Sequence, residues 1–171
     1  MRTAVKRQAP GLRPIERSLT IGLLRAREAV MARFRPLLNR HGVTEQQWRV
    51  IRVLAERRTA DATEVAAASC IHPASLSRIL RDLAGVGVLV ATASSTDSRR
   101  LVVKLTAAGR RRFREVGAES ELIYRCIEAE LGATEVAATL ARVNRLAQQL
   151  VVPARDGARV AANRTARTAR A

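Results

Sequence analysis

The sequence predicts a mainly α-helical fold with one small β-hairpin, and three observations support this class. Apolar residues recur at helical spacing in successive stretches of the 171-residue chain. The period changes to that of an extended chain after Gly85 and Gly87. Two β-branched runs, VGVLVAT and RLVVKLT, then flank the polar segment ASSTDSR, a pattern that is typical of a hairpin.

The first long helix is expected to begin after Ser18, which is suited to cap it. Its apolar stripe consists of Leu19, Leu23, Ala26, Val30, Phe34, Leu37 and Leu38. Gly42 is suited to end this helix. Thr44 and Gln47 have the spacing of a capping box, which predicts a second helix that runs to about Arg57.

The segment from 61 to 84 predicts two further helices joined by a tight turn. DATEVAAASCI indicates a short helix capped by Asp61 or Thr63, and its small residues permit close packing. HPASLSRILRDLAGVG indicates a second helix, because Pro73 loses no hydrogen bond in a first helical turn. Its buried stripe is predicted to be Leu76, Ile79, Leu80 and Leu83. This arrangement is typical of a helix-turn-helix.

The hairpin follows the second of these helices directly, so we interpret it as the wing of a winged helix-turn-helix DNA-binding domain. The helix would enter the major groove, while Arg99 and Arg100 at the wing tip would reach a phosphate or the adjacent minor groove. His72 would cap the helix or meet a phosphate. Asp97 would orient an arginine or only form the turn. The residues predicted to contact DNA are His72, Ser75, Ser77, Arg78, Arg81, Arg99 and Arg100.

Two more helices are expected after the wing, the first capped by Thr106 and the second beginning near Thr134. Their apolar stripes consist of Phe113, Val116, Ser120, Tyr124, Ile127 and Leu131, and of Val136, Leu140, Val143, Leu146 and Leu150. Stripes of this length exceed what one small domain covers, so a second copy of the chain is predicted to cover them.

The predicted organisation therefore has five segments. A basic flexible tail at 1–17 precedes a dimerisation helix at 18–43, and the DNA-binding region at 44–105 follows. C-terminal dimerisation helices at 106–152 precede a second basic tail at 153–171. A homodimer suits the DNA-binding interpretation, because a two-fold protein reads a pseudo-palindrome.

Charge supports a nucleic-acid partner. The formal net charge is +16, of which each tail carries +4 and residues 18–153 carry +8. This excess favours a polyanion, with nucleic acid ahead of a membrane surface. The chain has no apolar run long enough to span a membrane, and its N-terminus lacks the apolar stretch of a secretory signal, so a cytoplasmic protein is expected.

No motif indicates an enzyme. His41 and His72 are far apart, Cys70 and Cys126 form no CxxC pattern, and no glycine-rich phosphate loop occurs. A nucleophile paired with a base is also missing from the sequence pattern. We therefore expect no metal, no cofactor and no catalytic residue.

The wing and the helix that follows it resemble a known family. Asp97, Arg99, Leu105, Thr106 and Gly109 in DSRRLVVKLTAAG match the signature of the MarR family of dimeric winged-helix regulators. SLTIGLLRAREAVMARFRPLLNRHGVTEQQWRVIRVLAE is similar to the branch that regulates homoprotocatechuate degradation. The resemblance covers about residues 16–150. It implies repression of a catabolic operon that is relieved by a small aromatic or heteroaromatic acid, of the phenolic or hydroxynicotinate type.

The resemblance also implies an effector site between the dimerisation helices and the winged helix. The candidates there are Arg17, Ser18, Arg25, His41, Trp48 and Arg49. An aromatic acid needs one cation for its carboxylate and one flat apolar wall. Trp48 suits the wall, although a lone tryptophan is as often an ordinary core residue.

Two other interpretations remain open at this stage. Cys70, just before the recognition helix, would let a redox-sensing regulator respond to oxidation. However, AASCIHP has the pattern of a buried packing segment, and buried thiols are usually inert. A sequence-neutral architectural or RNA-binding protein would share the basic charge, and would bind specific and random duplexes alike.

Overall fold

The computed structural model describes residues 13–93 and 101–150. The chain divides into two units, Met1–Tyr124 and Arg125–Ala171, and each is described by itself. The predicted wing tip, with Asp97, Arg99 and Arg100, lies outside the described residues. So do residues 1–12 and 153–171 of the predicted tails, and residues 151–152 of the predicted C-terminal dimerisation helices. Ile15–Arg17 of the predicted N-terminal tail form a short 3-10 helix, η1.

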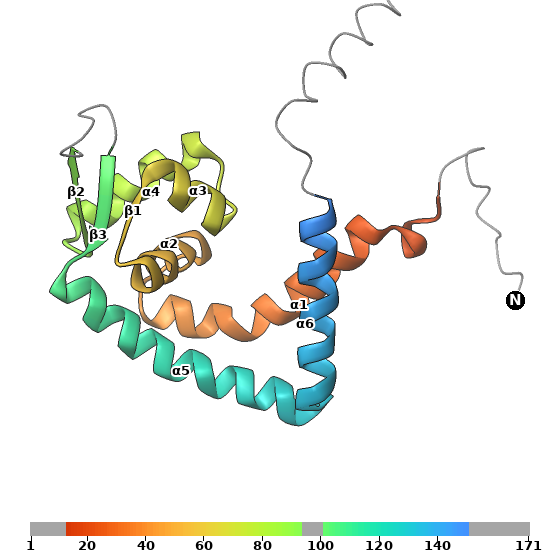
Figure 1. Cartoon of the computed structure of the whole chain (residues 1–171). Helices are drawn as coiled ribbons and strands as arrows, with labels where there is room; N and C mark the ends of the chain where they lie inside the picture. The colour runs from red at the N-terminus through yellow and green to blue at the C-terminus, as the bar shows by residue number, and fades with distance from the viewer. Residues whose placement is uncertain (1–12, 94–100, 151–171) are drawn as a thin grey trace, which may run out of the picture. The chain divides into compact units, whose positions relative to one another are not determined.

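The first unit contains four complete helices, the three described strands and the start of a fifth helix (Figure 1). The helices are α1 (Leu19–Arg40), α2 (Glu45–Arg57), α3 (Ala62–Ser69) and α4 (Pro73–Gly85). The strands are β1 (Thr59–Asp61), β2 (Leu89–Ala93) and β3 (Leu101–Leu105). The helix α5 (Ala107–Leu131) continues into the second unit, which also contains α6 (Ala133–Gln149). The predicted class, mainly helical with a small β wing, is confirmed.

Local capping explains where several helices begin. Thr44 and Gln47 form the predicted capping box of α2. Asp61, and not Thr63, is the N-cap of α3, and its Oδ1 accepts a hydrogen bond from the Glu64 N–H at 2.8 Å. Ser18 occupies the N-cap position of α1, but its side chain makes no capping hydrogen bond. Its Oγ instead lies 2.9 Å from Thr20 Oγ1.

The sheet is antiparallel with the order β1-β3-β2. The hairpin of β2 and β3 confirms the prediction, and its register places Leu89 opposite Leu105. The sequence did not predict β1, whose Ala60 lies opposite Val103. A strand of three residues is too short to show a period of two, and it forms here because β3 offers a free edge.

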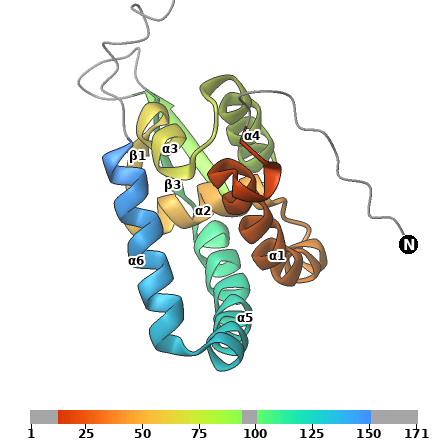
Figure 2. The same cartoon turned by 90° about the vertical axis from the view of Figure 1, so that its right-hand side faces the viewer.

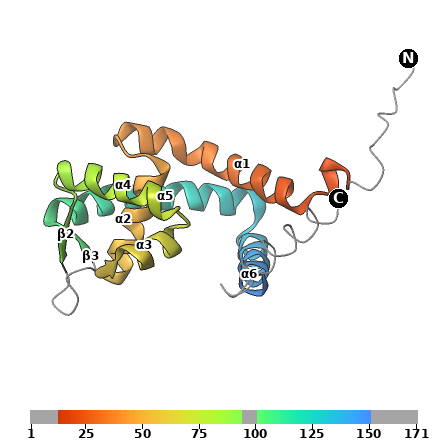
Figure 3. The ribbon, with the colours of Figure 1, turned by 90° about the horizontal axis from the view of Figure 1, so that it is seen from above.

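The core of the first unit surrounds α2. Figures 1 and 2 show α3 and α4 on one side of α2, with α1 and the N-terminal part of α5 on the other, and Figure 3 shows the same helices from above. The fully buried side chains include Val50, Ile51, Leu54 and Val65. Trp48 is 7% exposed and stacks on Phe113, with ring centroids 5.8 Å apart. The tryptophan predicted to form the wall of an effector site is therefore part of the core.

The predicted apolar stripes differ in how far their own chain covers them. Leu76, Ile79, Leu80 and Leu83 of α4 are all buried, as predicted. The second unit presents the opposite case, because α6 buries no residue. The large apolar side chains that stay exposed include Leu19, Leu23, Leu24 and Val30 of α1, Leu122 and Leu131 of α5, and Leu140 and Val143 of α6. None of the helices within the described residues is long and apolar enough to cross a membrane.

Candidate functional site

The turn between α3 and α4 is built by backbone geometry and a histidine cap. Cys70 ends α3 with φ 51° and ψ 47°, the left-handed conformation, and the Ile71 N–H donates to the Ala66 carbonyl at 3.0 Å. His72 Nδ1 accepts from the Ala74 N–H at 3.3 Å, which confirms the predicted cap. The turn thus sets the direction in which α4 leaves α3.

Cys70 itself corrects one expectation. The sequence predicted a buried thiol, but Cys70 is exposed, whereas its neighbours Ser69 and Ile71 are buried. The left-handed backbone turns the Cys70 side chain away from the face that α3 presents to the core. Burial therefore gives no reason to regard this thiol as inert.

The outer face of α4 carries the side chains predicted to read DNA. Ser75, Ser77, Arg78 and Arg81 are all exposed, because the opposite face of the helix is held in the core by its leucine-rich stripe. The Arg78 side chain is 82% exposed, and its Nε lies 3.9 Å from Asp82 Oδ2, a loose contact. The guanidinium is therefore available to an anion outside the protein.

A separate cavity of about 200 Å³ lies among α1, α2 and the Tyr124 region of α5. Its lining residues are Arg27, Val30, Met31, Phe34, Glu45, Trp48, Arg49, Arg52 and Tyr124. Aromatic rings form much of the wall, and the Phe34 and Tyr124 rings lie 4.9 Å apart. Among the residues that the structure describes, this is the place where three aromatic rings and several arginines meet.

Arg27, one of the cavity's cations, is already neutralised. Its Nη2 lies 2.5 Å from Glu45 Oε2, and its Nη1 lies 2.5 Å from Glu28 Oε1. Arg35 Nε contacts the other Glu45 oxygen at 2.7 Å. Burial raises the pKa of Glu45, but hydrogen bonds from Arg35 and Arg27 outweigh it and leave that pKa below its ordinary value. Glu45 therefore stays ionised at neutral pH and holds α2 to α1.

Arg52, a further cation of this cavity, has no acidic partner among the described residues. Its Nη1 lies 3.5 Å from the Tyr124 hydroxyl, and within the described residues it forms no ion pair. Arg52 follows Trp48 by four positions, so both side chains lie on one face of α2. A guanidinium, a phenol and an indole ring thus line the same cavity.

Arg49 connects this cavity to the helix-turn-helix. Its Nη1 donates to the carbonyl of Ser69 at 2.8 Å and to that of Cys70 at 3.3 Å. Its Nε is buried and has no hydrogen-bond partner within the part of the chain that the structure describes. One side chain therefore lines the cavity and also holds the C-terminal end of α3.

The six residues predicted to bind an effector separate into two groups. Trp48 and Arg49 line the cavity, whereas Arg17, Ser18, Arg25 and His41 do not. His41 Nε2 lies 2.7 Å from Glu119 Oε1, and this hydrogen bond, with a second from Arg40, lowers the pKa of Glu119. Sequence reasoning missed two lining residues. Arg52 has a signal, its spacing from Trp48, but Tyr124 is 72 positions from Arg52 and has none.

The comparisons with known proteins agree with this architecture. The family model described as MarR family matches residues 41–100. The HTH-type transcriptional regulator FarR of Neisseria gonorrhoeae is 45% identical over 115 residues, which cover 67% of this chain and 79% of that protein. The chain belongs to the MarR family.

Further relatives refine the comparison. The homoprotocatechuate degradative operon repressor of Escherichia coli is 40% identical over 119 residues, or 70% of this chain and 80% of that protein. The structure of NadR in complex with 4-hydroxyphenylacetate superposes with a TM-score of 0.70 at 39% identity, over 86% of this chain and 98% of that one. This MarR-family chain is accordingly a DNA-binding transcriptional repressor and not an enzyme. MarR regulators are dimers.

Proposed function

We propose that this repressor binds a pseudo-palindromic operator as a homodimer and leaves it when a small aromatic acid fills the cavity beside Trp48. The observation that carries the proposal is Arg52, a cation without an acidic partner among the described residues, next to the Tyr124 hydroxyl in an aromatic-walled cavity. NadR, a relative at 39% identity, was solved with an aromatic acid bound.

The chemistry of the cavity suits a single-ring acid. The carboxylate would accept hydrogen bonds from the Arg52 guanidinium and the Tyr124 hydroxyl. The ring would lie against Trp48 and Phe34, the apolar walls. The volume of about 200 Å³ is smaller than the roughly 300–1,000 Å³ of drug-sized sites, which favours one ring over larger ligands.

We propose that α4 and the wing together form the surface that contacts DNA. Ser75, Ser77, Arg78 and Arg81 would face the base edges or phosphates of the major groove, and His72 would approach a phosphate at the helix start. Arg99 and Arg100, outside the described residues, would reach the flanking minor groove or backbone. Two copies of α4 must then stand about 34 Å apart to match successive half-sites.

The exposed apolar faces of α1, α5 and α6 support the homodimer. Leu19 and Leu23 of α1 and Leu140 and Val143 of α6 stay between 38% and 58% exposed. A second copy that buries these faces removes apolar surface from water, worth about 25 cal/mol per Å². The dimer also sets the distance between its two copies of α4.

Arg49 offers a route by which the ligand acts on DNA binding. A carboxylate in the cavity attracts the Arg49 guanidinium, which competes with its hydrogen bonds to the Ser69 and Cys70 carbonyls. Loss of those bonds would loosen the turn that directs α4. A coupling of only about 1–3 kcal/mol lowers operator affinity roughly 5- to 150-fold.

The effector proposal is tested by Arg52→Gln with Arg57→Gln as the matched control, because Arg57 is an exposed arginine of the same helix outside the cavity. We expect Arg52→Gln to bind operator normally but to resist release by hydroxylated aromatic acids, while Arg57→Gln behaves as the wild type. Trp48, the single tryptophan, reports binding by fluorescence. If a broad panel of such acids changed neither the fluorescence nor the operator affinity, the proposal would fail.

The DNA proposal is tested by competition and by salt dependence. The operator duplex should outcompete a scrambled duplex at physiological salt. Arg99→Ala should weaken binding to both and lower the salt slope by about one unit, because one phosphate contact is lost. Equal competition by the scrambled duplex would instead favour the sequence-neutral protein.

A further inference from the structure

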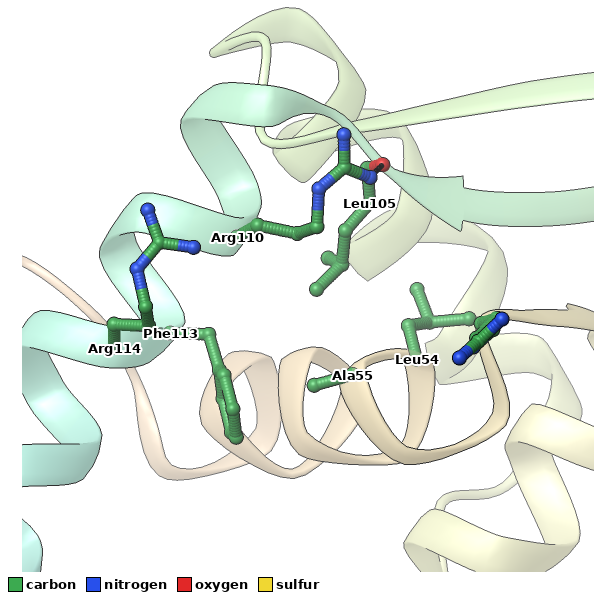
Figure 4. A pocket seen from close by; sticks show the side chains of 7 residues that line it. Leu54, Ala55, Leu105, Arg110, Phe113 and Arg114 are labelled. Atoms are coloured by element: carbon green, nitrogen blue, oxygen red, sulfur yellow. Dashed lines mark hydrogen bonds between the residues drawn. The ribbon is translucent and has the colours of Figure 1, made fainter.

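A second cavity, of about 420 Å³, lies where α2 ends, beside the junction of β3 and α5 (Figure 4). Its apolar surface comes from Leu54 and Ala55 of α2, Leu105 of β3 and Phe113 of α5. Figure 4 shows these side chains around one space. Its remaining lining residues are three arginines, Arg58, Arg110 and Arg114, so no lining residue is acidic.

The charge of these three arginines is not compensated within the described residues. Arg110 Nη1 donates to the Leu105 carbonyl at 2.8 Å, which holds its guanidinium beside the cavity. Arg58 and Arg114 form no ion pair with any described residue. Other arginines of the first unit do have acidic partners, such as Arg27 with Glu45 and Arg40 with Glu119. The local potential is therefore positive beside an apolar surface.

Arg58 is also held in a strained backbone conformation. Its φ of 63° and ψ of −51° place a residue with a side chain in a region that favours glycine. Arg58 joins the end of α2 at Arg57 to the start of β1 at Thr59, and Thr59 is held by the pairing of β1 with β3. The guanidinium is thus carried by a backbone with little freedom to move away.

This cavity is distinct from the one beside Trp48, because the two share no lining residue. They are nevertheless neighbours. Phe113 lines the arginine cavity, Trp48 lines the other, and the two rings stack at 5.8 Å with an interplanar angle of 27°. Any ligand that moves Phe113 therefore acts on the wall of the first cavity.

We propose that the cavity formed by Arg58, Arg110 and Arg114 binds an organic monocarboxylate with an apolar body. The carboxylate contacts the guanidinium groups, which suit it geometrically, and the body covers Leu54, Leu105 and Phe113. An inorganic anion has no apolar body, so its binding would leave this apolar surface exposed to water. The site is separate from the proposed effector site, and its existence does not depend on the function proposed for that site.

The stacked rings make the two sites interact. Occupancy of the arginine cavity changes the surroundings of Trp48 through Phe113, so it alters the affinity of the first cavity by a reciprocal factor. An acid bound in the arginine cavity thereby changes how tightly the cavity beside Trp48 binds its own acid.

The test is calorimetric titration of the full chain with benzoate, in an Arg52→Gln background that removes the guanidinium proposed to bind the carboxylate in the first cavity. We expect benzoate still to bind once per chain, and Arg114→Gln added to this background to weaken it roughly tenfold, as for a lost hydrogen bond to a charged group. Arg111→Gln is the matched control, because Arg111 lies on the same helix, contacts Glu115 and does not line the cavity.

Several outcomes would overturn the proposal. These are no benzoate binding in the Arg52→Gln background, equal weakening by Arg111→Gln, or equally tight binding of inorganic phosphate or benzyl alcohol. A fourth is that Arg114→Gln lowers DNA affinity and the salt slope while benzoate binding is unchanged, which would make Arg114 a DNA contact. Release of operator from the wild type by aromatic acids is measured separately, so this proposal and the proposed function fail independently.

Discussion

The helices α4 and α6 carry similar apolar stripes but have opposite surroundings. Leu76, Ile79, Leu80 and Leu83 of α4 are buried under α2, α3 and β2. In α6 the stripe includes Leu140, which is 58% exposed, and Val143, which is 40% exposed. The periodic pattern thus indicates a face that needs cover, but it does not indicate whether the cover comes from the same chain.

Helix α5 shows both situations along its length. Near its start Gly109, Val116 and Ser120 are buried, whereas Leu122 and Leu131 are exposed. MarR regulators are dimers, and we propose that a second copy covers the exposed part and α6. The difference between covered and uncovered stripes can be tested by substitutions that compare one with the other.

The largest effect is expected from Leu83→Ala in α4. Leu83 is 2% exposed, so the substitution should lower the free energy of unfolding by about 2–5 kcal/mol through lost burial and a cavity. Leu140→Ala in α6 is the counterpart. Its effect should depend on protein concentration, because it acts through the dimer. Urea denaturation at two concentrations measures both, and equal, concentration-independent losses would contradict the distinction.

The next largest effect on stability is expected from alanine substitutions at two glycines of α5. A Cβ at Gly109 would lie 2.0 Å from the Val88 carbonyl oxygen, so Gly109→Ala must displace backbone and should cost about 1–3 kcal/mol. Gly117 has open space around it, and Gly117→Ala should stabilise the helix by up to about 1 kcal/mol. Thermal unfolding measures the Tm of both variants. A shift of Tm in the same direction for both would contradict the close approach of Gly109 to the Val88 carbonyl.

A smaller effect on stability is expected at two helix N-caps, Asp61, which makes a capping hydrogen bond, and Ser18, which does not. Asp61 accepts a hydrogen bond from the Glu64 N–H, so Asp61→Ala should lower stability by about 1 kcal/mol. Ser18 caps α1 only by position, and Ser18→Ala should change stability by less than about 0.5 kcal/mol. Chemical denaturation distinguishes the two, and a larger loss for Ser18→Ala would show that the Ser18 side chain does act as a cap.

The smallest effect concerns pH and the contact between α1 and α5. A hydrogen bond from His41, followed by one from Arg40, lowers the pKa of Glu119 in the folded chain. A lowered folded pKa stabilises the fold above the unfolded value of about 4.5, and this contribution is lost as the pH falls through the folded pKa. Glu119→Gln should therefore flatten the acid limb of stability against pH. Glu115→Gln is the control, and an identical flattening would contradict the assignment.

Local features of the site were predictable from the residues alone. The capping box of α2, the cap at His72 and the exposed face of Ser75, Ser77 and Arg78 depend on neighbours within about one helical turn. Trp48 was also recognised as a wall, because aromatic residues are few in this chain. Such signals lie within a few positions of the residues they concern.

Other features of the site depend on residues that are distant in the chain. Tyr124 reaches Arg52 only because α5 packs against α2, and β1 forms only because β3 offers an edge 43 positions later (Ala60 opposite Val103). The exposure of Cys70 follows from a left-handed residue that its surrounding sequence, AASCIHP, does not announce. The first cavity forms where α1, α2 and Tyr124 of α5 meet, and the second forms where α2 meets β3 and the beginning of α5.

The order of helices, their caps and the charge of the outer face of α4 follow from the amino-acid sequence, since hydrogen bonds and apolar periodicity are local. The pairing of Trp48 with Phe113 and the contact of Arg52 with the Tyr124 hydroxyl arise from packing, which joins residues without regard to their separation in the chain. A periodic stripe specifies that a face must leave water. The three-dimensional fold determines which faces its own side chains cover, and so which ones remain for a second copy or a ligand.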